Sequence, residues 1–394
     1  MPHRHSKSLM ETLAQYSPTC KVDRSLCIST HLIRATDNSP VVGIEAEHTS
    51  KKETINLFSD ALIWYHHHFN NNGTLRFILG ESPSNMHPVL CALATLCHNL
   101  QPRVKVQVEI DQVPADLSLP EFSQEEDPWA RTLLTRGDMP LPELAVRLSR
   151  EVGCPSFRWY FTLKARRWSG RVEGLIVCSL SPDGTSGTLG IGAPGKHGAI
   201  GQARQHFTEL AGQEEIRFNV DNLSDVAKII KALAKDRQTG VLAHLDPEHH
   251  LESRILRGVV PVRLQDSTEL EMVQKDHSFQ LPTRWHPGGV PKYLDVLMRS
   301  GKTPWAVELK VAESFHVRYY RHAICQAVLY REFIRHATSF FPWFERHGLD
   351  PTQCRAAIAF PKPSRLNQTA EVGLADIQWL ADLFQVKVIT LDLA

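Results

Sequence analysis

The sequence lacks the features that define several large classes of protein. Its eight cysteines form no CxxC pair and no zinc-finger spacing, which favours reduced thiols over disulfides or a structural zinc site. No apolar run approaches the roughly 20 residues that cross a bilayer. The N-terminal stretch MPHRHSKSLMETL has no apolar core of the signal-peptide kind. We therefore expect a cytoplasmic protein with no membrane association.

An excess of charge of one sign is also absent. The 394 residues hold 44 Lys and Arg against 43 Asp and Glu, so the formal net charge is +1. Any affinity for nucleic acid must therefore come from local basic patches and not from the field of the whole protein. The chain is 42% hydrophobic and long enough for two or three domains that each bury a core.

The order of apolar patterns predicts an α/β protein with five regions. Strand-like alternation and helical periodicity follow one another along most of the chain, whereas proline and acidic residues interrupt the pattern after residue 110. The predicted regions are a polar lead-in over 1–40, a small α/β domain over 41–110, an acidic, proline-rich linker over 111–142, an α/β recognition or regulatory domain over 143–242, and a last domain over 243–394.

The last domain has the most informative order of elements. We predict a helix over 247–258, strands over 269–273, 292–298 and 305–311, a long helix over 317–337, a strand over 355–360, a helix over 373–384 and a strand over 386–393. This αβββαβ order predicts a mixed sheet flanked by helices.

Two acidic residues stand opposite each other in the predicted hairpin KYLDVLM-RSGKTP-WAVELKV. Asp295 and Glu308 are symmetric about its turn, and opposite residues of an antiparallel pair have Cβ atoms about 4.5–5.5 Å apart. Two carboxylates at that distance repel each other unless a cation lies between them, which favours a hard divalent ion. Lys310 shares a strand face with Glu308. The alternative, a surface salt bridge from Glu308 to Lys302 or Lys310, leaves the apolar flanks unexplained.

The long helix that follows carries polar side chains on an otherwise apolar surface. His322, Gln326 and Tyr330 are spaced by four and line one stripe, which is compatible with facing a site. The helix and its lead-in also contain arginines opposed only by Glu332, which predicts a local basic surface for phosphates. These arginines are Arg318, Arg321, Arg331 and Arg335.

These residues resemble the PD-(D/E)xK nuclease superfamily. The resemblance rests on Asp295, on Glu308-Leu309-Lys310 and on the element from Gln326 to Tyr330, which is similar to that of RecB-like and restriction-type members. It covers residues 243–394 only. One departure is that Leu294, and not proline, precedes the aspartate.

The resemblance implies a metal site and a set of catalytic roles. Asp295, Glu308 and the backbone carbonyl of Leu309 would bind Mg²⁺, with Mn²⁺ as a substitute. Glu252 of the first helix would bind the ion directly or through water, and Glu248 is the less favoured choice for that place. The ion would polarise the phosphate and activate a water.

The remaining roles fall to residues around the metal. Lys310 would orient the attacking water or stabilise developing charge. Gln326 and Tyr330 would position water, backbone or the lysine.

A second basic segment lies in the region over 143–242. The stretch FRWYFTLKARRWSGR interleaves basic and aromatic residues and contains no acidic one. Core packing explains part of the aromatic content, and a hairpin tip at KARRW predicts contact with nucleic-acid backbone or bases. The candidate nucleic-acid-binding residues are therefore Lys164, Arg166 and Arg167 here, with Arg318, Arg321 and His322 from the long helix.

A glycine-rich stretch in the same region partly matches a phosphate-binding loop. Gly190, Gly195 and Lys196 have the required spacing, but His197 stands where Ser or Thr should bind Mg²⁺. A glycine-rich turn is the better interpretation. A nest of backbone amides that contacts a phosphate and a nucleotide-driven switch are the alternatives.

Together these observations predict a Mg²⁺-dependent nuclease, an (endo)deoxyribonuclease acting in antiviral defence, restriction or DNA processing. We expect it to work as a homo-oligomer or with a partner protein. The alternative is a nucleic-acid-binding or assembly subunit that keeps the nuclease fold and does not cut. The motif fits DNA or RNA, and endonuclease or exonuclease action.

Overall fold

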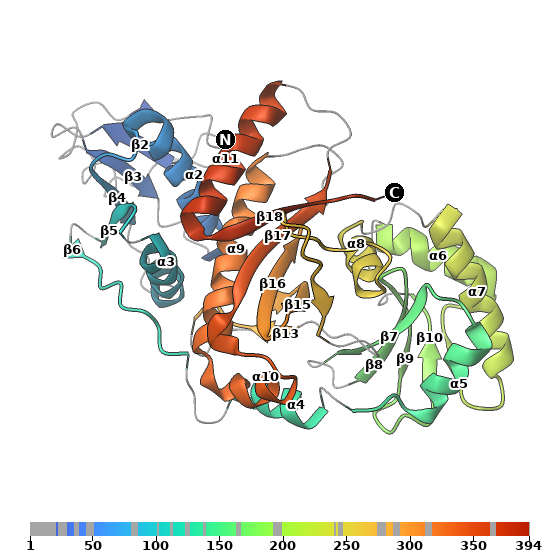
Figure 1. The fold of residues 1–394 in the computed structure, drawn as a ribbon. Helices are drawn as coiled ribbons and strands as arrows, with labels where there is room; N and C mark the ends of the chain where they lie inside the picture. The colour runs from blue at the N-terminus through green and yellow to red at the C-terminus, as the bar shows by residue number, and fades with distance from the viewer. Residues whose placement is uncertain are drawn as a thin grey trace.

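The computed structural model is a mixed α/β protein (Figure 1). It describes residues 21–22, 30–34, 39–44, 51–79, 86–100, 102–110, 113–122, 127–136, 139–162, 167–191, 199–239, 242, 247–273, 281–286, 292–311, 317–362 and 368–393, without the side chains of 21–22, 30–34, 44, 51–53, 86, 136, 162, 199, 317–318 and 368–372. Within these ranges the strands form three large sheets and one two-stranded sheet. None of the helices described is long and apolar enough to cross a membrane.

The N-terminal domain is a six-stranded sheet with a parallel centre. Its strands are β1 (Lys21–Val22), β2 (Thr30–Arg34), β3 (Pro40–Ile44), β4 (Thr74–Leu79), β5 (Lys105–Ile110) and β6 (Val113–Pro114), in that order across the sheet. The crossovers between the parallel strands β3, β4 and β5 are α2 (Lys51–Phe69) and α3 (Met86–Leu100). This alternation agrees with the elements expected over 41–110.

The expected polar lead-in over 1–40 is wrong at its C-terminal end. Residues 30–34 form β2, which pairs antiparallel with β3 from Thr30 opposite Ile44 to Arg34 opposite Pro40. The five residues THLIR carry no apolar alternation, so local pattern gives no strand signal. Pairing with a strong neighbouring strand supplies the stability instead.

The segment over 111–142, expected to be a linker, is exposed in part and packed in part, with residues 113–121 exposed or half-exposed and the stretch from Asp127 onward forming a packed helix. Its helix α4 (Pro128–Arg136) begins at Asp127, whose Oδ1 accepts from the backbone N–H of Trp129 at 2.8 Å. Asp127 is buried in an ion pair with Arg284, and the ring of Phe122 packs edge-on against Phe333 at 5.7 Å. Proline and acidic residues predict irregular backbone, but they do not predict whether that backbone is exposed. Here the part of the segment that contains Phe122 and Asp127 packs on the C-terminal domain.

The middle domain is a five-stranded antiparallel sheet covered by helices. Its elements are α5 (Glu143–Val152), β7 (Phe157–Thr162), β8 (Arg167–Val172), β9 (Leu175–Leu180), β10 (Gly187–Leu189), α6 (Ala199–Ala211), β11 (Ile216–Phe218) and α7 (Leu223–Thr239), with the strand order β11-β10-β9-β8-β7.

A tight turn joins β8 to β9. Val172 pairs with Leu175, and the two residues between them, Glu173 and Gly174, have φ of 46° and 84°. Positive φ at both central positions defines the hairpin turn that matches strand twist. A Cβ at Gly174 would lie 2.2 Å from the backbone oxygen of His249, so only glycine fits there.

The C-terminal domain keeps the expected order of elements, but the strand expected over 292–298 is divided at Asp295 into two strands that belong to different sheets. The strand over 281–283 and the helix over 341–346 are additional. The elements are α8 (Pro247–Leu256), β12 (Glu271–Met272), β13 (Leu281–Thr283), β14 (Lys292–Leu294), β15 (Val296–Ser300), β16 (Thr303–Leu309), α9 (Val317–His336), α10 (Phe341–Arg346), β17 (Arg355–Pro361), α11 (Gln368–Phe384) and β18 (Val386–Leu391).

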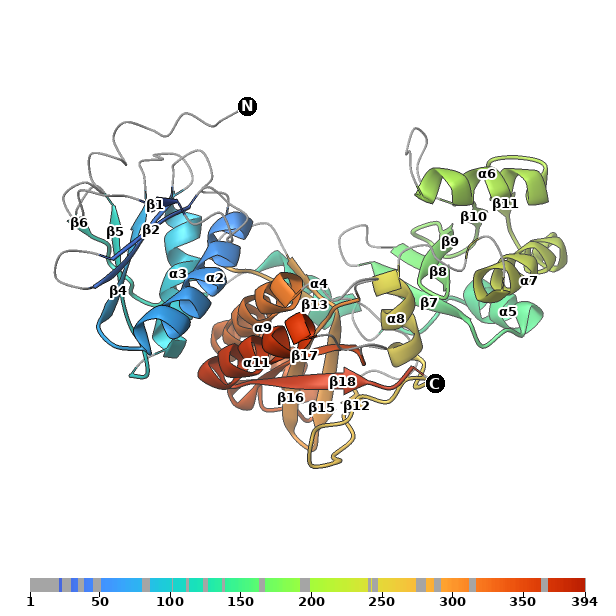
Figure 2. The same cartoon turned by 90° about the horizontal axis from the view of Figure 1, so that it is seen from above.

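The main sheet of this domain runs β12-β15-β16-β17-β18, and its last three strands are parallel. Helices α9 and α11 cover one face, and α8 with the chain that follows it covers the other (Figures 1 and 2).

The N-terminal and C-terminal domains share a layer of helices. Figure 2 shows α2 and α3 between their own sheet and the pair α9 and α11. The ring of His66 stacks on Trp379 at 4.1 Å, and Arg103 donates to the backbone oxygen of Asp382 at 2.7 Å. Because helices of the first domain bury those of the last, the two domains are one packing unit.

Candidate active site

The register of the β15–β16 hairpin is the one expected. The pairing runs from Ser300 opposite Thr303 to Val296 opposite Val307 and ends one residue before Asp295 and Glu308 would face each other. Asp295 lies where the chain passes from β14 to β15, and its Oδ2 accepts from the backbone N–H of Leu309 at 2.8 Å. The carboxylate therefore takes the place of a strand partner and is held beside β16.

Glu308 and Lys310 form a buried ion pair next to this aspartate. Lys310 Nζ donates to Glu308 Oε1 at 2.7 Å, and the two side chains are only 6% and 4% exposed. The second oxygen, Glu308 Oε2, is buried with no hydrogen-bond partner. The salt bridge of the alternative interpretation therefore exists between Glu308 and Lys310, but it lies inside the protein and not on the surface.

The two carboxylates perturb one another strongly. Burial raises the pKa of Asp295 well above its ordinary value, and the charge of Glu308 raises it further. Burial also raises the pKa of Glu308, although the Lys310 ammonium and a hydrogen bond with Asp295 oppose that shift. For Lys310, burial by itself would lower the pKa, but the neighbouring carboxylates outweigh it and the pKa is raised. The cluster therefore favours an added proton or an added cation.

The first helix brings Glu248, the less favoured choice of the sequence analysis, to this cluster. Glu248 Oε2 lies 3.7 Å from Lys310 Nζ and accepts from the hydroxyl of Tyr319 at 2.6 Å. Glu252 is buried one helical turn further along α8, where its charge raises the pKa of Tyr160 in β7. Glu248 therefore contacts Lys310, and the role expected of Glu252 stays a prediction.

Helix α9 faces the site through a stripe that differs from the expected one. Tyr319, Ala323, Gln326 and Tyr330 share one face, because alternating steps of four and three residues follow the 3.6-residue turn. Lys310 Nζ lies 5.1 Å from the centre of the Tyr319 ring. A row spaced strictly by four rotates about 40° at each step, so His322 lies off this stripe.

Tyr330 lies close to the carboxylates and is held by backbone. Its hydroxyl donates to the backbone oxygen of Tyr293 in β14 at 3.3 Å. Burial raises the pKa of Tyr330 well above its ordinary value, and the charges of Glu308 and Asp295 raise it further. The structure thus brings together Asp295, Glu308, Leu309, Lys310 and Tyr330, and adds Glu248 and Tyr319.

The arginines expected to form a basic surface on α9 hold the helix to its neighbours instead. Arg321 Nη2 lies 3.3 Å from Asp60 Oδ1 on α2, and His322 Nε2 lies 3.8 Å from the same oxygen. Arg331 is buried and pairs with Glu332.

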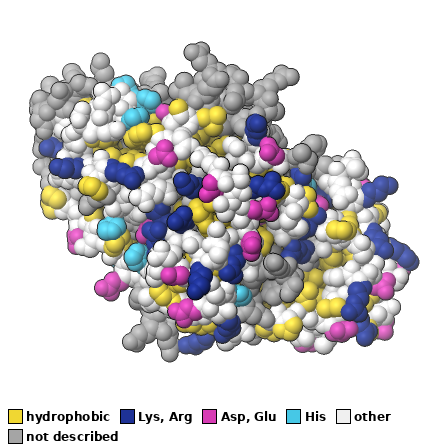
Figure 3. All heavy atoms as spheres, viewed as in Figure 1, with side chains coloured by type: hydrophobic (Ala, Val, Ile, Leu, Met, Phe, Trp, Pro, Cys, Tyr) yellow, Lys and Arg dark blue, Asp and Glu magenta, His cyan; other side chains and the backbone are white. Residues whose placement is uncertain are grey.

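Arg335 does not add to a basic surface on α9 either. Arg335 donates to the backbone oxygen of Cys354 at 2.9 Å, and the side chain of Arg318 lies outside the described residues. Basic and acidic side chains are interspersed over the face shown in Figure 3.

Two candidate positions of the middle domain fall outside the described residues. These are Lys164 and Arg166, between β7 and β8, and the loop that contains Gly195 and Lys196 is outside them as well. Arg167 opens β8 and is exposed.

The donors at the site suit a hard divalent cation. Magnesium is commonly held by one or two carboxylates together with waters and substrate phosphates, and Asp295, Glu308 and the carbonyl of Leu309 supply oxygens of this kind. The unpartnered Glu308 Oε2 is the atom that such an ion would satisfy. Across the part of the chain that the structure describes, no group of three or more His, Cys, Asp or Glu side chains is arranged to hold a metal.

Comparisons with family models, with curated proteins and with solved structures find no significant match to this chain. The geometry of the site is therefore the basis on which a function is assigned to this protein.

Proposed function

We propose that the protein is a divalent-metal-dependent nuclease that hydrolyses phosphodiester bonds, with DNA as its substrate. The observation that carries the proposal is the buried trio of Asp295, Glu308 and Lys310, in which one carboxylate oxygen has no partner. Burial of two adjacent carboxylates costs free energy. A cation bound between them would offset that cost, and such a cation could in turn bind a phosphate. The resemblance of these residues to the PD-(D/E)xK superfamily supports the same assignment.

The residues have separate roles in this proposal. Asp295, Glu308 and the carbonyl of Leu309 would hold Mg²⁺ or Mn²⁺, which when bound supplies Lewis-acid polarisation of the phosphate and a more acidic water. The lysine stays protonated at neutral pH because its pKa is raised. It therefore acts as a fixed positive charge beside the phosphate and not as a general base. Glu248 and Tyr319 hold this ammonium in place.

Cleavage assays test the proposal directly. Supercoiled plasmid, linear duplex and single strands are incubated with Mg²⁺, Mn²⁺ or EDTA, and wild type is compared with Lys310→Ala and Glu308→Gln. We expect cutting that requires metal and is lost in both variants. Lys302→Ala, at the exposed turn of the same hairpin, is the matched control and should cut normally.

Two outcomes would count against this function. Cutting that survives Lys310→Ala would assign the activity to another site. Nucleic-acid binding without any cutting would favour the non-cleaving binding subunit.

A further inference from the structure

One face of the middle-domain sheet is rich in arginine and contains no acidic residue. Strands β7 to β11 have the sequences FRWYFT, RWSGRV, LIVCSL, GTL and IRF, so they hold four arginines and neither Asp nor Glu. Directly paired residues of a sheet point to the same side. Arg158 pairs with Arg171, and Thr188 pairs with Arg217.

The register places all four arginines on one side. The row that crosses the sheet reads Tyr160, Ser169, Ser179, Thr188 and Arg217, and it is flanked by the pair Arg158–Arg171 and by Arg167. We call these residues the arginine face. The opposite side carries the buried core, in which Trp159 Nε1 donates to the backbone oxygen of Ala145 in α5 at 3.2 Å.

Arginines of this face are available to a ligand. Arg167 and Arg217 are exposed. The guanidinium of Arg171 lies 4.4 Å from the centre of the Tyr160 ring, and its Nε is buried. Tyr160 is itself only 2% exposed, so this end of the row is covered and the ligand-accessible part of the face is the part with Arg167 and Arg217.

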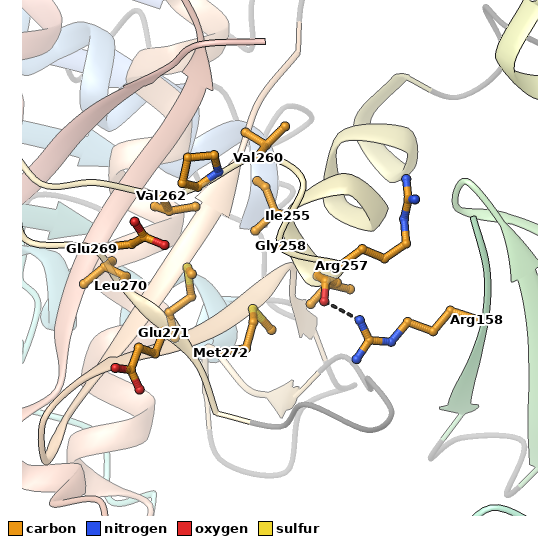
Figure 4. Close-up of a pocket in the computed structure, with 13 residues that line it drawn as sticks. Arg158, Ile255, Arg257, Gly258, Val260, Val262, Glu269, Leu270, Glu271 and Met272 are labelled. Carbon is orange, nitrogen blue, oxygen red and sulfur yellow. Dashed lines mark hydrogen bonds between the residues drawn. The ribbon is translucent and has the colours of Figure 1, made fainter. Parts of the chain in front are cut away.

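The arginine face meets the candidate active site through α8. Tyr160 packs in the same apolar cluster as Leu251 of that helix, and Arg158 donates to the backbone oxygen of Leu256 at its end (Figure 4). Glu248 lies eight residues before Leu256, or about 12 Å along the helix axis at 1.5 Å per residue. Figure 2 shows the sheet between α8 on one side and α5 and α7 on the other.

We propose that the arginine face binds the sugar–phosphate backbone of the nucleic acid that the candidate site cuts, an inference that rests on the proposed function. Arginine and hydroxyl side chains are the usual partners of backbone phosphates, and Ser179 and Thr188 lie between the arginines. From β8 to β11 the face spans about 14 Å at 4.8 Å per strand, which equals about four steps of one duplex strand at 3.4 Å each.

Binding measured in EDTA isolates this surface from catalysis. The full-length protein is titrated against labelled duplex and single-stranded DNA at several salt concentrations, with Arg167→Gln/Arg217→Gln as the test variant. Each lost phosphate contact lowers the slope of log K against log salt by about 0.9 for duplex, so the slope should fall by about 1.8 and Kd should rise about tenfold. Arg167→Lys/Arg217→Lys should keep the wild-type slope.

A matched control removes the same charge from the other side of the sheet. Lys228 and Lys231 are exposed on α7, so Lys228→Gln/Lys231→Gln should bind DNA as wild type does. Equal melting temperatures establish that all variants fold.

The outcomes separate this inference from the proposed function. Wild-type affinity and slope in the Arg167/Arg217 variant would overturn the arginine face while leaving metal-dependent cutting intact. Binding through the face without metal-dependent cutting would overturn the nuclease and keep the face. A wild-type protein that binds no nucleic acid would overturn both.

Discussion

At the scale of single residues, Asp295 and Glu308 decide whether a cation belongs at the site. Burial raises the pKa of both carboxylates, and the charge of Glu308 raises that of Asp295 further, so a divalent ion that binds only the folded protein should stabilise it. We expect Mg²⁺ or Mn²⁺ at about 100 times its Kd to raise the free energy of unfolding by about 2.7 kcal/mol. Denaturant unfolding with metal and with EDTA measures this. Asp295→Asn should abolish the effect, and an equal gain in that variant would place the ion elsewhere.

The two glutamates of α8 give a second test at this scale. Glu248 contacts Lys310, whereas Glu252 lies a turn away beside Tyr160. Loss of a residue that orients an active-site group commonly costs about 10–100-fold in activity, and we expect that loss in kcat for Glu248→Gln. Glu252→Gln should keep near-wild-type kcat. The reverse ranking in steady-state cleavage assays would support the role expected for Glu252.

These residues also show what sequence can and cannot resolve. The proximity of Asp295 and Glu308 follows from hairpin symmetry, because strand register is fixed by the turn. The choice between Glu248 and Glu252 is not available locally, since the two differ by about one helical turn and present nearly the same face. Only the packing of α8 on the sheet decides which turn reaches Lys310. Tyr319 was overlooked because its spacing from Tyr330 mixes steps of four and three.

At the scale of the element, Glu332 anchors the C-terminal end of α9. Burial alone would raise the pKa of its carboxyl, but the hydrogen bond with His336 and the charge of Arg331 outweigh this and lower it to about 2. Because the folded pKa of Glu332 lies below the ordinary value of 4.5, its ionised carboxylate stabilises the protein above that pH. This stabilisation is lost as the pH falls toward 2. A shift of this size corresponds to about 3 kcal/mol.

Glu332→Gln should therefore lower the free energy of unfolding at pH 7 by about 3 kcal/mol. The difference from wild type should shrink steadily as the pH is lowered below the ordinary glutamate pKa. Denaturant melts at a series of pH values measure this, and Glu345→Gln on the exposed side of α10 is the control. A deficit that does not change with pH would mean that packing, and not charge, explains the effect.

Elements were predictable where their pattern is periodic and not where tertiary contacts define them. The strands β16, β17 and β18 and the helix α9 follow long apolar patterns, and the structure has them close to the expected residues. Strand β2 has no such pattern, and its existence depends on pairing with β3. The burial of Asp127 could not be predicted from the local sequence either, because its partner Arg284 lies 157 residues away.

At the scale of the whole molecule, the domains differ in how much they depend on one another. Helix α9 is buried between its own sheet and helices α2 and α3, and charged side chains such as Arg321 and Arg331 are paired within that layer. The elements of the middle domain pack chiefly on each other. Its attachment to the rest relies on a few contacts at α8, such as the ion pair of Glu173 with Arg257 at 2.5 Å.

The middle domain and the C-terminal domain should therefore behave differently when each is expressed as an isolated fragment. We expect residues 139–242 alone to be soluble and to unfold in one cooperative transition, because that fragment keeps its sheet and all three of its described helices. Residues 243–394 alone should aggregate, since removal of α2 and α3 exposes the apolar surface of α9 and α11. Co-expression with residues 1–138 should restore solubility, because that fragment also returns Phe122 and Asp127 to their partners. Light scattering and thermal melts measure both outcomes, and a soluble, cooperatively folding 243–394 fragment would show that the shared helical layer is dispensable.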